Sequence, residues 1–154
     1  MLSNSSANIH ALIDEALKQE LYESAQLMAQ FQLSFERDNQ SQLQMQLADA
    51  AVGLGEDRRA IHLYEQAASH CMDDEAMLAD IHFKFARCCF RLQEHALTKQ
   101  ALLNIPSRLH SVPMLLLLAR CHEECTEYVF VPEIRQGFLS GVYVEQPYKS
   151  TDKS

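Results

Sequence analysis

Apolar residues recur along most of this 154-residue chain at intervals of three and four positions, which places them on one face of an α-helix. Asp73-Asp74 can cap a helix that begins at residue 75, and Pro106 cannot continue the helix before it. Residues 1–128 are therefore predicted to form one helical repeat domain. Its helices are expected at residues 7–18, 21–36, 40–54, 57–70, 75–92, 95–104 and 112–125.

The helical pattern ends near Glu127. Val129-Phe130-Val131-Pro132 interrupts it, a short helix is predicted around residues 133–139, and the residues from Gly141 onward form a mostly polar tail. Residues 129–154 are thus predicted to be an irregular capping segment and a polar tail. A repeat array that stops here leaves its last apolar face uncovered, so either this segment caps the array or the natural protein continues.

The helical segments repeat at the spacing typical of tetratricopeptide (TPR) helix pairs, roughly 34 residues. Ile13, Ala48, Ala86 and Ala119 occupy equivalent positions in four successive segments. Small residues at such positions let two antiparallel helices approach, and large residues fill the space between neighbouring pairs. The period predicts an all-α TPR helix-turn-helix solenoid of about three and a half repeats, with a generic helical bundle as the alternative. The residues predicted to pack the repeats are Leu47, Ala48, Ala60, Tyr64, Ala67, Phe85, Ala86, Leu118 and Ala119.

Composition narrows the classes of partner. Thirteen Lys and Arg residues against 21 Asp and Glu residues give a net charge of −8, which disfavours binding to a phosphate backbone. The longest purely apolar run, Met114–Ala119, is far too short for a membrane span, and the first residues lack the basic flank of a secretory signal. We expect an intracellular protein with neither nucleic acid nor membrane as its partner.

The five cysteines are an odd number without the spacing of a disulfide framework, so we interpret them as reduced thiols. Cys121 and Cys125, with Cys88 or His122, could present a zinc site, but burial as small apolar side chains is favoured. The seven histidines are scattered, and no phosphate-binding loop or pair of catalytic carboxylates is present. The chain is therefore predicted to have no catalytic residues, no metal and no cofactor, and not to be an enzyme.

Three stretches of the chain, Ile81–Cys89, Leu102–Arg108 and Met114–His122, resemble the N-terminal TPR domain of the family of subunit seven of the anaphase-promoting complex. The resemblance covers residues 8–125, and Ile105-Pro106-Ser107-Arg108 is its most specific fragment. This chain lacks that family's long polar insertion between the second and third repeats, and its repeat pattern ends at Val129.

The resemblance implies a non-catalytic scaffold subunit of a ubiquitin ligase, acting in mitosis, cell division and cell-cycle control. It also implies a homodimer that contacts other TPR subunits of the ligase, in the nucleus and the cytoplasm. Independently, the first helix pair is more apolar than one neighbouring repeat requires. Either a second copy covers these side chains or they fill the core of the chain itself. The candidates for the dimer interface are Ile9, Leu12, Ile13, Leu17, Leu27, Met28 and Phe31.

A second hypothesis is a peptide-binding adaptor. Stacked repeats form a concave groove lined by the first helix of each pair. On that helix of the third repeat, Lys84, Arg87 and Arg91 lie at positions i, i+3 and i+7, and Arg120 is the fourth-repeat equivalent of Arg87. This basic strip could receive an acidic or C-terminal peptide through charge-assisted hydrogen bonds. The alternative is a solvated face whose charges pair locally.

Overall fold

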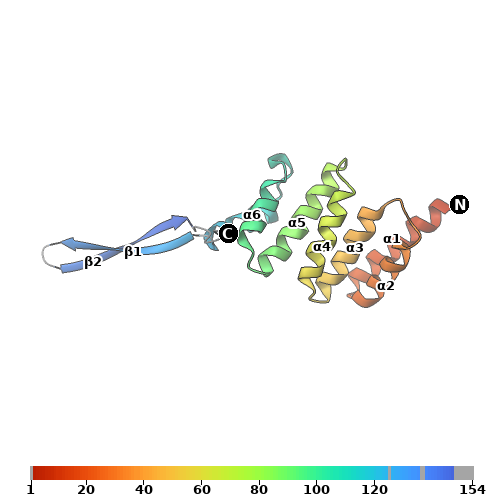
Figure 1. Ribbon diagram of the computed structural model, residues 1–154, viewed down its shortest axis with the longest axis horizontal. Coiled ribbons are helices and arrows are strands. Elements are labelled where there is room, and N and C mark those ends of the chain that lie inside the picture. Colours follow the sequence, from red (N-terminus) through yellow and green to blue (C-terminus); the bar gives the residue numbers. More distant parts are fainter. Residues whose placement is uncertain (1, 125, 136–137, 148–154) are drawn as a thin grey trace, which may run out of the picture.

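The chain folds as a row of antiparallel helices followed by a β-hairpin (Figure 1). The computed structural model describes residues 2–124, 126–135 and 138–147, and the side chains of residues 8–124. No helix in these parts of the chain is both long and apolar enough to cross a membrane. The helices are α1 (Leu2–Lys18), α2 (Tyr22–Leu33), α3 (Gln40–Gly53), α4 (Asp57–Ser69), α5 (Glu75–Arg91), α6 (His95–Leu103) and α7 (Val112–Glu124), with a 3₁₀ turn η1 (Ser107–Leu109) between the last two.

The TPR-like helical repeat fold is confirmed. The helices pair as α1 with α2, α3 with α4 and α5 with α6, and each lies beside the next along the row (Figure 1). The carboxylate of Asp74 caps α5 by accepting a hydrogen bond of 3.0 Å from the backbone N–H of Met77. After α6 ends, Pro106 starts the 3₁₀ turn because it cannot extend a helix.

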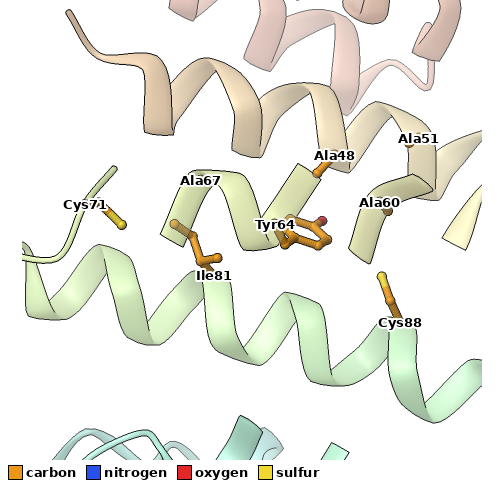
Figure 2. Close-up of a cluster of buried hydrophobic side chains, with 8 residues drawn as sticks. All are labelled: Ala48, Ala51, Ala60, Tyr64, Ala67, Cys71, Ile81 and Cys88. Atoms are coloured by element: carbon orange, nitrogen blue, oxygen red, sulfur yellow. The ribbon is translucent and has the colours of Figure 1, made fainter. Parts of the chain in front are cut away.

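Small side chains set the close spacing of the helices. Ala48 of α3 and Ala60 of α4 are fully buried in one cluster (Figure 2), and their small side chains permit a close approach of the two helices. Tyr64 of α4 fills the adjacent space and meets Ile81 and Cys88 of α5. Full burial of a side chain the size of Ile81 contributes about 1.5–3 kcal/mol. This cluster joins the second repeat to the third.

The residues predicted to pack the repeats occupy three environments. Phe85 and Leu118 are half-buried, whereas Ala119 is exposed. Within the described residues no helix follows α7, so Ala119 shares an open face with Val112, Leu115 and Leu116, whose exposed fractions are 69%, 49% and 61%. The remaining six residues are buried: Leu47, Ala48, Ala60, Tyr64, Ala67 and Ala86.

The first helix pair divides its apolar residues between core and surface. Ile13 is fully buried in a cluster with Ala25, Ala29 and Leu43. Four of the seven candidates for a dimer interface thus belong to the core of the chain itself: Ile9, Ile13, Leu17 and Met28. The other three are more than half exposed: Leu12, Leu27 and Phe31.

Two strands follow the helices, where an irregular segment was predicted. β1 (Thr126–Arg135) pairs antiparallel with β2 (Phe138–Pro147), in a register that places Val131 opposite Val142 and Pro132 opposite Gly141. The predicted short helix around residues 133–139 is wrong, because β-branched and aromatic residues favour strands. A proline is tolerated because each strand of a two-stranded ribbon is an edge. The hairpin extends away from the helices beyond α7 (Figure 1), and residues 148–154 of the predicted tail lie outside the described residues.

Candidate functional site

The candidate site is the surface formed by the first helices of the repeats, α3, α5 and α7, which we call the groove. A depression of about 240 Å³ opens there between α3 and α5. It contains three of the four cations predicted to form a basic strip, and the fourth, Arg120, lies on α7. The depression is lined by Asp49, Val52, Tyr64, Lys84, Arg87 and Arg91.

Lys84 is neutralised by carboxylates within the groove. Its Nζ donates a hydrogen bond of 2.9 Å to Asp49 Oδ2 of α3 and lies 3.6 Å from Asp80 Oδ2, one turn earlier on α5. Asp49 also accepts a hydrogen bond of 2.5 Å from the Tyr64 hydroxyl. Burial lowers the pKa of Lys84, but the two carboxylates outweigh burial and raise the pKa overall. Lys84 therefore holds α5 to α3 as a cation at neutral pH.

Arg91 is also ion-paired. Its Nε and Nη2 donate hydrogen bonds of 3.1 and 2.8 Å to Asp57 Oδ1 at the start of α4, and the hydrogen bond to Asp57 raises the pKa of Arg91. Nη2 further donates to the buried sulfur of Cys88 at 3.2 Å. The guanidinium thus anchors the end of α5 to the preceding repeat, and most of its donors are already used.

Arg87 and Arg120 differ from the other two cations. Neither forms an ion pair or a hydrogen bond with another described residue; both lie over aromatic rings instead. The guanidinium carbon of Arg87 is 5.8 Å from the centre of the Phe83 ring, and that of Arg120 is 4.8 Å from the centre of the Phe90 ring. We call these four residues the arginine–phenylalanine row. The rings orient both guanidinium groups while their N–H donors remain available.

The row continues across two repeats. Phe83, Arg87 and Phe90 lie at positions i, i+4 and i+7 of α5 and therefore share one face of that helix. Arg120 reaches the same row from α7, because it stacks on Phe90. Leu116, one turn before Arg120, is 61% exposed and adds an apolar surface beside the second arginine. The row combines two available cations with exposed apolar area.

The four described thiols are shielded from solvent and stay protonated at neutral pH. Cys71, Cys88, Cys89 and Cys121 are free and buried, and burial raises the pKa of Cys88 to about 11 and that of Cys89 to about 12. Cys121 donates a hydrogen bond of 2.9 Å to the carbonyl oxygen of His95. Within the described residues, no three His, Cys, Asp or Glu side chains are grouped to hold a metal ion, and Cys125 lies outside that part of the chain.

The groove contains residues that the sequence pattern did not single out. The carboxylates of Asp49, Asp57 and Asp80 cancel half of the predicted basic strip. One of them was visible in the sequence, since Asp80 and Lys84 have the i, i+4 spacing of a helical ion pair. Asp49 and Asp57 pair with cations about one repeat further along the chain. These ion pairs form between adjacent repeats, so spacing within one helix does not reveal them.

The fold is similar to that of solved bacterial chaperones. The crystal structure of PcrH from Pseudomonas aeruginosa is 15% identical, with a TM-score of 0.60, over 79% of this chain and 89% of that chain. PcrH in complex with the chaperone binding region of PopD gives 16% identity and a TM-score of 0.61, over 77% and 86%. The Yersinia enterocolitica type III secretion translocator chaperone SycD is 19% identical, with a TM-score of 0.62, over 79% of this chain and 81% of that chain. At these identities the similarity establishes the fold alone.

No protein-family model matches the sequence, and no curated protein matches it either. The assignment to subunit seven of the anaphase-promoting complex is wrong, because the similar structures are translocator chaperones with TPR-like folds. The roles inferred from that assignment, a ubiquitin-ligase scaffold in mitosis, cell division and the cell cycle, are wrong with it. The predicted partners, a second copy of this chain and other TPR subunits of the ligase, are wrong as well. PcrH was solved in complex with the chaperone binding regions of PopD and PopB, which are not ubiquitin-ligase subunits. The nuclear localisation also fails, since both source organisms are bacteria.

Proposed function

We propose that this chain is a non-catalytic TPR-like adaptor whose groove binds an acidic segment of a partner protein. The arginine–phenylalanine row carries the proposal. In a groove that otherwise neutralises its own charges, Arg87 and Arg120 alone among the four predicted cations have no carboxylate partner within the described residues. Two exposed guanidinium groups on aromatic rings are suited to binding carboxylates through paired N–H donors.

The spacing of the row favours an extended ligand. Arg87 and Arg120 lie on successive first helices, one repeat apart in the sequence, and Phe90 lies between them. A peptide that crosses from α5 to α7 would place one carboxylate at each arginine and an apolar side chain against Leu116. Lys84 and Arg91 hold the repeats together and do not contact the ligand directly. Of the four cations in the predicted basic strip, Arg87 and Arg120 therefore select the ligand.

The similar structures support a protein segment as the ligand. PcrH, which shares this fold, has been solved with the chaperone binding region of PopD and with that of PopB. The carboxylates that this chain binds belong either to acidic side chains or to a C-terminal carboxylate. The charges of the row fit both sources, so the probe peptides must separate them.

Binding of fluorescein-labelled peptides to the full chain, followed by fluorescence anisotropy, tests the proposal. The probes are extended peptides of one length with two Glu residues, with two Lys residues in their place, and with or without an amidated C-terminus. We expect the Glu peptides to bind and the Lys peptides not to. Arg87→Glu and Arg120→Glu should each weaken binding about tenfold or more, because a hydrogen bond to a charged group contributes about 1.5–3 kcal/mol.

The matched control is Lys99→Glu, which makes the same change of charge at an exposed position of α6. It should leave the affinity within about twofold, since long-range charge effects are screened in physiological salt. Equal losses with Lys99→Glu and Arg87→Glu, or equal binding of the Lys and Glu peptides, would contradict the assignment of this site.

A further inference from the structure

A second cavity lies on a different face of α5 from the groove. It has a volume of about 320 Å³ and opens between α4 and α6, with α5 as its floor. Ile81 and Phe85 form the apolar floor, and Ala68, Leu97 and Ala101 form apolar walls. The volume lies at the small end of the range typical of ligand pockets, about 300–1,000 Å³. Its other lining residues are Tyr64, Glu65, His82, Gln100 and Asn104.

The repeat pattern explains why this space is open. In the register that aligns α4 with α6, Leu63 corresponds to Ala101 in the next repeat. Leu63 packs against the apolar clusters on both sides of α4 and so fills the junction between its repeat and the preceding one. At the next junction Ala101 offers only a methyl group where Leu63 has an isobutyl group. The shorter side chain leaves room for at least an isobutyl group in the cavity between α4 and α6.

The rim of the cavity carries a carboxylate without a strong partner. Glu65 forms no ion pair with a Lys or Arg side chain among the described residues; the imidazole of His62 lies 3.9 Å from it, and both side chains are largely exposed. On α5, burial lowers the pKa of His82, which favours its uncharged form. The side-chain amides of Gln100 and Asn104 form no hydrogen bond with any other described residue. The rim therefore combines one negative charge with two available amides.

We propose that this cavity binds one leucine-sized apolar side chain of a partner polypeptide that carries a lysine or arginine beside it. The apolar side chain takes the place that Leu63 fills at the preceding junction. The basic neighbour pairs with Glu65, and the amides of Gln100 and Asn104 bond the backbone of the incoming segment. The charge preference is opposite to that of the groove, so the two sites select different segments and the second does not depend on the first.

Short capped peptides in a Gly-Ser frame, titrated into the ¹⁵N-labelled full chain and followed by NMR, test this inference. Their cores are Arg-Leu-Arg, Arg-Ala-Arg and Glu-Leu-Glu. The Arg-Leu-Arg peptide should shift the amide signals of Ala68, Leu97 and Ala101, with a dissociation constant at least tenfold below those of the other two. Ala101→Leu should remove these shifts by filling the cavity, and should keep or raise the unfolding temperature.

The matched control is Ala96→Leu, the same substitution at an exposed position of the same helix, which should leave binding unchanged. Glu65→Gln should lower the affinity for the Arg-Leu-Arg peptide toward that for the Glu-Leu-Glu peptide. If Ala101→Leu disrupts folding, Ala101→Val fills part of the space and should weaken binding in proportion. Shifts that survive the filled cavity, equal binding of the three peptides, or loss of binding in Arg87→Glu would each overturn the inference. The last outcome would assign the peptide to the groove.

Discussion

Gly53 and Tyr22 form a contact whose energetic effect the structure allows us to predict in sign. Gly53 ends α3, and a Cβ atom added there would lie 2.2 Å from Cδ1 and 2.5 Å from Cγ of the Tyr22 ring on α2. Carbon atoms pack at about 3.5–4.0 Å, so the ring would have to move by more than about 1 Å. Overpacking of this kind costs about 1–3 kcal/mol, whereas alanine gains about 0.5–1 kcal/mol over glycine in a helix. Gly53→Ala should therefore destabilise the fold, by up to about 2.5 kcal/mol.

A double-mutant cycle in urea, followed by circular dichroism, measures this coupling. In the Tyr22→Ala background the obstacle is gone, so Gly53→Ala should become stabilising by up to about 1 kcal/mol. Gly55→Ala is the control: nothing lies within 4 Å of its Cβ position, and its φ of 79° strains any side chain whatever residue 22 is. Its cost should be the same in both backgrounds. An equal effect of Gly53→Ala with and without the tyrosine ring would refute the reasoning.

Three further results are expected. Asp74→Ala, which removes the cap of α5, should lower the free energy of unfolding by about 1 kcal/mol, measured in urea, while Asp73→Ala should not. Because folding raises the pKa of Lys84, its charge stabilises the fold fully below the ordinary pKa of 10.5, and this contribution is lost as the pH rises through the higher folded value. Lys84→Met should therefore reduce the loss of thermal stability above pH 10.5, measured as the unfolding temperature. Iodoacetamide at pH 8 should leave Cys88 and Cys89 unmodified in the native protein and modify both in urea, as mass spectrometry of their peptides would show; modification of the native protein would contradict their burial.

The sequence pattern was sufficient for the helical repeats because the signals that define each helix are local. The spacing of apolar residues places α3, α4 and α5 close to their observed bounds, and the cap at Asp74 was readable from residue type alone. The repeat period indicated the fold class, because TPR helix pairs repeat small residues at intervals of about 34 positions. The same local reasoning failed at β1 and β2. Pro132 was interpreted as a break in regular structure, although the β-branched and aromatic residues beside it favour a strand.

The short motif that suggested a ubiquitin-ligase subunit misled because it reflects repeat packing. Ile105 is buried in the cluster between α5, α6 and α7, and Pro106 begins the turn between repeats. Both roles belong to the fold, so the motif carries little information about function. Function depends on which side chains remain available on the surface. Contacts between helices determine this availability.

The sequence alone thus determined the helices, their period and the small residues at their crossings, because these features depend on neighbours within a few turns. Only the tertiary structure decided which cations are free: Asp49 and Asp57, one repeat away, neutralise Lys84 and Arg91 and leave Arg87 and Arg120 over aromatic rings. It also decided that Ala101 opens a cavity where Leu63 closes one. Both outcomes depend on contacts between adjacent repeats, whose distances are set by helix packing and not by the order of residues along one helix.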